Sequence, residues 1–430
     1  MGILGTAAAS VLQPPPMYVF GNSTLNVGSN NFLTGTNLPR ANMSYYGVDF
    51  PGFLTEFPYM IMSYKLAVEG FVLWLVISME VFGAAASVLQ PPPMYVFGDS
   101  TLDVGNNNFL TGINVPRANM PYYGVDFPGF PTGRFSNGRN TADFFAKKIG
   151  FVGSPPPYLS LASSSSLLVS TALTIGTSFA SGGAGILDST NAGNNIPLSK
   201  QVQYLNATKW KMIAAAGDAA VAALLAKSLV LVGIGGNDLS VFANAELANK
   251  NKSAADLQSD TATFYGCLIS NYSATIMDLY TLGARKLAII TVGLAGCLPV
   301  ARVLDACADD RNQLAAGFND ALRSLLASLA TRLPGLTYSV ADSLGLMVDT
   351  IADPEASGFT DIADACCGGG RLGAEEGCSP NATLCANRDQ YYFWDAVHPT
   401  QRAAFLLRRP GQVHHAHQLQ AAALVHMMTA

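Results

Sequence analysis

The chain has 430 residues, of which 50% are hydrophobic and only 12% are charged, and its formal net charge is −5 at pH 7. This negative charge, with no run of more than two consecutive Lys or Arg residues, excludes nucleic acid as an expected partner. The charged fraction is about half of the ~25% usual in soluble domains, which is typical of a secreted glycoprotein whose surface relies on Ser, Thr, Asn and sugar.

The chain begins with a partial copy of a later segment. Residues 7–53 differ from residues 84–130 at only six of 47 positions, and the likeness stops there while the second copy continues into new sequence. Two copies are too few for a solenoid, which needs at least three repeats. We therefore predict that residues 1–61 are an artefactual or non-functional duplicate, in which Ser23 is inert.

Residues 62–86 have the pattern of a secretory signal peptide inside the chain. A lysine precedes an apolar run over residues 71–78, and small residues follow. Glu69 and Glu80 leave an apolar stretch far shorter than the ~20 residues of a membrane span. The pattern predicts a secreted domain over residues 87–405, located in the extracellular space or the cell wall, with no stable membrane span after removal of the signal.

The secreted domain alternates strand-like and helical patterns. Apolar runs bounded by glycine, proline or polar residues are followed by longer stretches with apolar residues at i, i+3 and i+4, as over residues 310–334. This alternation predicts an α/β fold with a central parallel sheet covered by helices on both faces. Functional side chains are expected at the carboxyl ends of the strands. The four clearest strand-like runs are 93–98, 228–236, 285–293 and 336–343.

Cysteine and sequon positions also indicate an oxidising, secretory environment. All seven cysteines lie between Cys267 and Cys385, and four of them fall within residues 366–385. We predict local disulfides there and a second closable loop from Cys297 to Cys307, with Cys267 left over; the pairing of the four remains open. No metal is expected, because a zinc site would need a C-x-x-C pair and a nearby histidine. Six N-x-S/T sequons occur, at Asn22, Asn42, Asn206, Asn251, Asn271 and Asn381.

Histidine is scarce, which narrows the choice of a catalytic base. Four of the five histidines fall in the last seventeen residues, within a segment (406–430) that we predict to be an atypical, disordered tail rather than a metal site. The remaining one, His398, follows Asp395 by three residues, so the carboxylate can hold one ring nitrogen while the other faces a nucleophile. Pro399 disfavours a helix at His398. An isolated D-x-x-H pair is usually a surface pair, so a nucleophile must meet it.

Ser100 is the candidate nucleophile, because it follows an apolar run and Gly98 at the expected end of a strand. A helix cap is the alternative role for this serine. The stretch FASGGAG, with Gly182, and the stretch VGIGGND, with Asn237, offer N–H donors that could hold an oxyanion together with the Ser100 N–H. Neither glycine cluster has the spacing and lysine of a phosphate-binding loop.

The blocks FGDSTLDVGNNN, FASGGAGIL, GIGGNDL and FWDAVHPT, in this order, resemble the four sequence blocks of the plant GDSL esterase/lipases within the SGNH hydrolase superfamily. The resemblance covers about residues 88–404, and it includes GCLP followed by Arg302 and the CCGGG region. Thr101 stands where the family usually has a leucine.

The resemblance implies a three-layer α/β/α sandwich similar to flavodoxin, without a cofactor. It implies that Ser100 is the nucleophile, that His398 is its general base and that Asp395 orients His398. The oxyanion hole would be formed by Ser100, Gly182 and Asn237.

The expected activity is a secreted serine hydrolase that cleaves carboxylic esters through an acyl-enzyme on Ser100. The substrate would be a small-molecule or polymer-linked ester, such as an acyl or acetyl ester of a lipid, a cuticle precursor or a cell-wall glycan. Two alternatives remain open: an acyltransferase that uses the same residues, and a non-catalytic glycan- or partner-binding protein with this fold. The sequence gives no indication of the oligomeric state.

Overall fold

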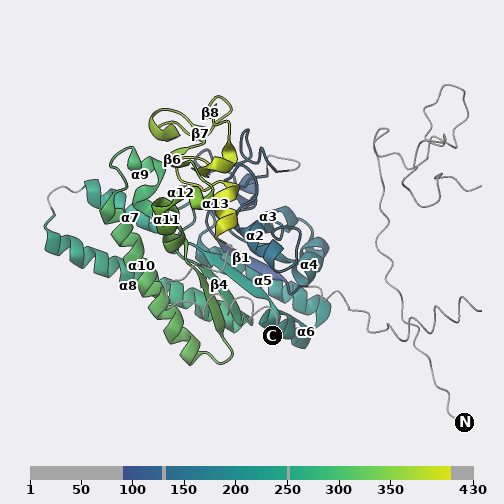
Figure 1. Ribbon diagram of the computed structural model, residues 1–430. Helices are drawn as coiled ribbons and strands as arrows, with labels where there is room; N and C mark the ends of the chain where they lie inside the picture. The colour runs from purple at the N-terminus through teal and green to yellow at the C-terminus, as the bar shows by residue number, and fades with distance from the viewer. Residues whose placement is uncertain (1–90, 128–131, 249–251, 408–430) are drawn as a thin grey trace, which may run out of the picture. The chain divides into compact units, whose positions relative to one another are not determined.

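The computed structural model describes residues 91–127, 132–248 and 252–407. Figure 1 shows these residues as a sheet with helices packed against it. The duplicated residues 1–61, the signal-like residues 62–86 and nearly all of the predicted tail lie outside the described residues. Predictions about those segments therefore stay predictions.

The central sheet has five parallel strands in the order β2-β1-β3-β4-β5. This is the strand order of flavodoxin-like folds. All four runs predicted as strands contain one. The additional strand, β2, was not predicted, because it is only three residues long and has no apolar run. The strands are β1 (Met94–Gly98), β2 (Gly176–Ser178), β3 (Leu229–Gly233), β4 (Lys286–Ile290) and β5 (Thr337–Ala341).

Helices follow the strands in the pattern that the sequence predicts, and the predicted helix over residues 310–334 corresponds to α10. Two helices begin at a capping box, formed by Asn140 with Asp143 and by Ser253 with Asp256. The helices are α2 (Thr141–Lys148), α3 (Tyr158–Leu161), α4 (Ser165–Thr174), α5 (Leu198–Ala216), α6 (Asp218–Lys227), α7 (Gly236–Ala248), α8 (Ala254–Leu282), α9 (Pro299–Arg302), α10 (Asp309–Arg332), α11 (Ser343–Ala352), α12 (Pro354–Ser357) and α13 (Gln401–Leu406). Short 3-10 turns are η2 (Asn106–Phe109), η3 (Ala295–Cys297), η4 (Arg371–Gly373) and η5 (Arg388–Gln390).

Alternate side chains of the strands enter two separate hydrophobic cores. Tyr95 and Phe97 of β1 belong to a large core that contains side chains of α5, α8 and α10. Met94 and Val96 belong to a smaller core that contains side chains of α2. Strands β1 and β3 are thus buried on both faces, which explains their continuous apolar sequences. This arrangement confirms the predicted three-layer α/β/α sandwich.

The segment after α12 forms two small sheets outside the central one. Strand β6 (Asp361–Ala365) pairs with β9 (Tyr391–Phe393), and β7 (Cys367–Gly368) pairs with β8 (Thr383–Leu384). Two disulfides hold this segment, Cys366–Cys385 and Cys367–Cys378, and a third joins Cys297 to Cys307. The predicted local disulfides are confirmed, and Cys267 is the free, exposed cysteine.

Within the described ranges, no helix combines the length and the apolar composition that crossing a membrane requires.

Candidate active site

The candidate site lies beside β1, where the chain changes the side of the sheet to which it adds its next strand. Strand β1 is flanked by β2 on one side and by β3 on the other, so the connections that leave β1 and β2 run to opposite sides of the sheet. The carboxyl ends of the two strands at such a point form a natural crevice for a ligand. Ser100 follows β1 and Asn237 follows β3, so the sheet brings both residues to this crevice.

The turn that carries Ser100 is fixed by the end of β1. A Cβ on Gly98 would lie 2.2 Å from the Gly233 carbonyl oxygen, so only glycine allows the two strands to approach this closely. The buried side chain of Gln201 accepts from the Gly98 N–H at 2.8 Å and donates to the Gly98 carbonyl at 2.9 Å. Asp99 accepts from both the N–H and the hydroxyl of Thr101. These bonds leave Ser100 half-buried at the edge of the crevice.

A buried carboxylate, Asp103, joins the serine turn to the predicted oxyanion loop. It accepts from the N–H groups of Gly105 and Asn106, both at 2.7 Å, and from the Gly182 N–H at 3.0 Å. Burial raises the pKa of Asp103 to about 6, against the opposing effect of these hydrogen bonds. The Asn107 amide adds a bond to the Gly182 carbonyl. The two glycine-containing loops therefore hold each other in place.

His398 lies between Ser100 and Asp395. Its Nε2 is 2.7 Å from the Ser100 Oγ, and its Nδ1 is 2.8 Å from Asp395 Oδ2 and 2.9 Å from Oδ1. The ring is 8% exposed and lies against Phe135, with 4.9 Å between ring centroids. As Pro399 predicts, the segment is a loop and not a helix. The structure thus brings together three side chains that the sequence separates by up to 298 residues.

Asp395 is held as a carboxylate in a buried position. Its Oδ1 accepts from the backbone N–H groups of Val397 and His398, and its Oδ2 accepts from the Tyr123 hydroxyl at 2.8 Å. Burial alone would raise the pKa of Asp395, but the neighbouring His398 and these hydrogen bonds lower it below its ordinary value. The carboxylate is therefore charged at neutral pH and can stabilise a protonated imidazole.

The three predicted oxyanion donors differ in their present bonding. The Ser100 N–H has no partner among the described residues. The Asn237 side chain donates one hydrogen to the Ala184 carbonyl at 2.9 Å, which leaves its second hydrogen free. The Gly182 N–H is already bound to Asp103. The next amide, that of Gly183, donates no hydrogen bond in the described part of the chain.

The structure gives Gly182 a packing role as well. A Cβ at this position would lie 2.7 Å from the ring of Phe135, the same ring that contacts His398. The glycine therefore lets the oxyanion loop pass beneath that ring. Its neighbouring segment is anchored by the buried Asp238, which accepts from the N–H groups of Ile186 and Leu187.

Sequence reasoning missed Tyr123 and Gln201, for different reasons. Gln201 lies among the apolar positions of α5 that face the core, so its polarity on that face is a signal that could have been noticed. Tyr123 has no local signal, since it meets Asp395 across 272 residues of sequence.

A cavity of about 220 Å³ opens beside Ser100 and His398. Its lining includes polar residues, among them Ser100, Asn237 and His398, and many apolar side chains. Such a cavity can hold a hydrocarbon group next to the serine oxygen. The apolar lining of the cavity comprises Ile234, Ile290, Val292, Leu294, Leu298, Met347, Phe393 and Val397, among others.

No cluster of three or more His, Cys, Asp or Glu side chains arranged for a metal ion is found in the described ranges.

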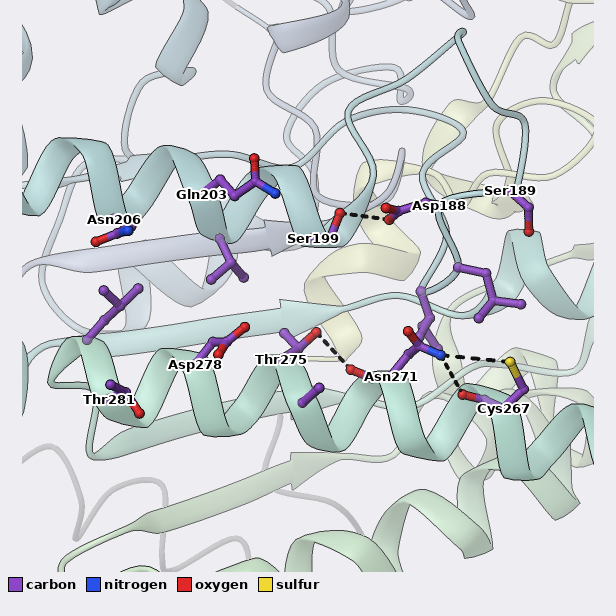
Figure 2. A pocket seen from close by; sticks show the side chains of 15 residues that line it. Asp188, Ser189, Ser199, Gln203, Asn206, Cys267, Asn271, Thr275, Asp278 and Thr281 are labelled. Carbon is purple, nitrogen blue, oxygen red and sulfur yellow. Dashed lines mark hydrogen bonds between the residues drawn. The ribbon is translucent and has the colours of Figure 1, made fainter.

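A larger groove, of about 680 Å³, lies between α5 and α8 (Figure 2). Ser199 on α5 donates to Asp188, and the Asn271 amide on α8 points to the carbonyl and thiol of Cys267. None of its lining residues is a histidine, so the groove has no pair of serine and histidine like that of Ser100 and His398. Size alone would select this groove, but the contact between Ser100 and His398 lies at the smaller cavity.

Comparison with known proteins agrees with this geometry. The sequence pattern of the GDSL-like lipase/acylhydrolases matches residues 94–407. The chain is similar to a GDSL esterase/lipase of Arabidopsis thaliana at 36% identity over 356 residues, which cover 80% of this chain and 92% of the relative. A second Arabidopsis GDSL esterase/lipase is 40% identical over 75% of this chain and 85% of its own length. A third is 36% identical over 73% and 86%, respectively.

Proposed function

Because the chain belongs to the GDSL-like lipase/acylhydrolase family and is a carboxylic-ester hydrolase, we propose that it cleaves esters through an acyl-enzyme on Ser100. The observation that carries this proposal is the 2.7 Å contact between Ser100 Oγ and His398 Nε2, with Asp395 on the other ring nitrogen. A serine hydroxyl is a weak nucleophile until a base takes its proton, and this contact supplies the base.

The proposed reaction has two halves. His398 Nε2 takes the hydroxyl proton of Ser100 as the Oγ attacks the ester carbonyl carbon, and the imidazolium then gives that proton to the departing alcohol. Water next attacks the acyl-Ser100 ester while His398 takes a proton from it. The bond between the acyl carbon and Ser100 Oγ then breaks, the imidazolium returns the proton to Oγ, and the carboxylic acid is released. Asp395 keeps its negative charge throughout and stabilises the imidazolium in both halves.

The negative charge that develops on the carbonyl oxygen needs N–H donors. We assign the Ser100 N–H and the free hydrogen of Asn237 to this role. The Gly182 N–H already donates to Asp103, so it can take part only if it breaks that hydrogen bond or divides between Asp103 and the oxyanion. The Gly183 N–H, which donates no hydrogen bond in the described part of the chain, is an additional candidate in the same loop. Each such donor is typically worth about 10² to 10³ in rate.

The apolar cavity supports an acyl ester as the substrate. A hydrocarbon chain bound there would gain about 0.8 kcal/mol for each methylene that leaves water, or about a fourfold gain in kcat/KM per methylene until the cavity is full. Acyl or acetyl esters of lipids, cuticle precursors or cell-wall glycans are the proposed substrates. The same residues could pass the acyl group to an alcohol instead of water.

We also propose that the protein is secreted, to the extracellular space or the cell wall. Three disulfides support an oxidising compartment. The sequon asparagines Asn206, Asn271 and Asn381 have exposed side chains, as attached glycans require. Figure 2 shows the first two on facing walls of the groove between α5 and α8. The signal-like residues 62–86 remain the proposed targeting segment.

Hydrolysis of p-nitrophenyl esters of increasing acyl length tests the proposal. Ser100→Ala in the full chain should lower kcat/KM by about 10⁴-fold or more, because the nucleophile is removed. Ser23→Ala, the equivalent change in the duplicated segment, is the matched control and should leave the rate unchanged. The proposed mechanism is wrong if Ser100→Ala keeps more than about a tenth of the wild-type rate while the protein remains folded.

A further inference from the structure

Tyr123 lies outside the four sequence blocks, yet its hydroxyl bonds directly to Asp395. We propose that Tyr123 is a positioning residue for ester hydrolysis, holding the Asp395 carboxylate in the orientation that faces His398 Nδ1. Tyr123 is not among the residues that line the cavity beside Ser100, and in this proposal it acts through Asp395. The inference rests on the Ser100 mechanism proposed above.

The two oxygens of Asp395 are held unequally, which gives Tyr123 its importance. Oδ1 accepts from two backbone N–H groups as well as from His398 Nδ1. Among the described residues, Oδ2 has only the Tyr123 hydroxyl besides His398 Nδ1. Without that hydroxyl, Oδ2 would lack one of its two donors in a position that is 4% exposed to water. A carboxylate in such a position turns toward other donors or admits water, and either change disturbs the imidazole.

Tyr123 is well placed to hold the carboxylate, because its own ring is fixed. It is 8% exposed and packs edge-on against Phe135 and Trp394, with ring centroids 6.0 and 6.4 Å apart. Burial and the negative charge of Asp395 both raise the pKa of Tyr123 above its ordinary value of 10.0, so its hydroxyl is protonated and can donate at neutral pH. The buried ring costs no further entropy when the hydrogen bond forms.

The loop around Tyr123 is also tied to the segment that carries Asp395 and His398. Asp126 forms a bidentate ion pair with Arg388, with both N–O distances 2.7 Å. The Tyr122 hydroxyl donates to the Pro380 carbonyl at 3.2 Å. Two neighbouring tyrosines of one loop thus each give one hydroxyl bond to the same C-terminal segment, but only that of Tyr123 reaches the proposed triad.

This pairing provides a matched experiment, Tyr123→Phe beside Tyr122→Phe in the full chain. Each variant loses one hydroxyl from the same loop. We expect Tyr123→Phe to lower kcat by about tenfold, as the loss of one hydrogen bond to a charged group implies, with KM within about twofold. Tyr122→Phe should leave both parameters unchanged.

A double-mutant cycle separates positioning from a general loss of structure. In an Asp395→Asn background, Tyr123→Phe should cause no further loss of kcat, because the carboxylate that it holds is absent. An equal loss in both backgrounds, or the same loss in Tyr122→Phe, would overturn the inference. So would a Tyr123→Phe variant with wild-type kcat. In each of these cases Ser100→Ala still reports separately on the proposed nucleophile.

Discussion

The two halves of the candidate site are held by different kinds of structure. Ser100 extends from β1, a strand with neighbours on both sides in the central sheet and a hydrophobic core on each face. His398 lies on the segment after β9, outside that sheet. This segment is held by short strands, disulfides and side-chain bonds such as those of Arg388 and Tyr123.

The difference implies that local opening costs less free energy in the segment that carries His398 than in the sheet that carries Ser100. Regions with large buried cores unfold only with the whole domain, whereas segments held by a few contacts can open locally at a smaller cost. Ser100 should therefore stay in place under conditions in which His398 has already moved away. Activity would then be lost before the fold is lost, and the loss would begin in the C-terminal segment.

Removing the disulfide Cys366–Cys385 should have the largest effect, because it loosens the segment that carries His398 while leaving the central sheet intact. The bond closes a loop with a sequence separation of 19, for which about 3 kcal/mol of stabilisation is expected. In Cys366→Ala/Cys385→Ala we expect at least a tenfold loss of ester hydrolysis at temperatures where the far-ultraviolet circular dichroism is still native. Cys267→Ala, which removes the free cysteine, is the control. Simultaneous loss of activity and helical signal would mean that the segment is not a separate unit.

Gln201→Met should have a smaller effect and should act on the opposite half. The change leaves the Gly98 N–H and the Ile196 carbonyl without their side-chain partner in a buried place, at a cost of about 2 kcal/mol in the free energy of unfolding. Urea denaturation measures this loss. Gln203→Met, on the same helix but exposed, should change the free energy by less than about 0.5 kcal/mol. If the two variants are equally stable, Gln201 does not hold the end of β1.

Acidification should produce the smallest effect, and it can be followed separately in each half. Burial opposes ionisation of Asp143, but the Arg134 charge and hydrogen bonds lower the pKa of Asp143 below its ordinary value. Stability from this carboxylate is therefore complete above the ordinary Asp pKa near 3.8 and is lost as the pH falls through the lowered value.

Asp126, which pairs with Arg388, also has a lowered pKa, and the same sign applies to it. We expect Asp143→Asn to make the fall of the unfolding free energy shallower as the pH drops below about 3.8. Asp126→Asn should instead change the acid loss of activity more than the acid loss of stability. Identical pH profiles for both variants would contradict the separation of the two halves.

The sequence predicted the sheet better than it predicted what surrounds the site. Central parallel strands are buried on both faces, so their apolar runs are visible without any partner. The edge strand β2, with the sequence Gly-Thr-Ser, has no such run. The disulfide pairing stayed open because Cys366 and Cys367 are adjacent, and spacing alone cannot assign Cys378 and Cys385 between them.

The contact between Ser100 and His398 could be predicted because the sequence offers few other candidates. His398 is the only histidine before the last seventeen residues, and Ser100 follows a strand-like apolar run. The bond from Tyr123 to Asp395 could not be predicted, since neither residue has a local pattern that depends on the other. Gly182 shows a third case. Its role as an oxyanion donor stays a prediction from the sequence, whereas its bond to Asp103 and its packing under Phe135 are visible only in three dimensions.

The separation of 298 residues between Ser100 and His398 has a consequence for the protein during its synthesis. The ribosome must translate nearly the entire domain before the proposed base exists, so a nascent or prematurely terminated chain has a serine but no means to deprotonate it. Under the proposed mechanism, hydrolysis therefore starts only after translation has passed residue 398 and the last segment has docked. Until then the unfinished chain is expected to be inactive toward esters.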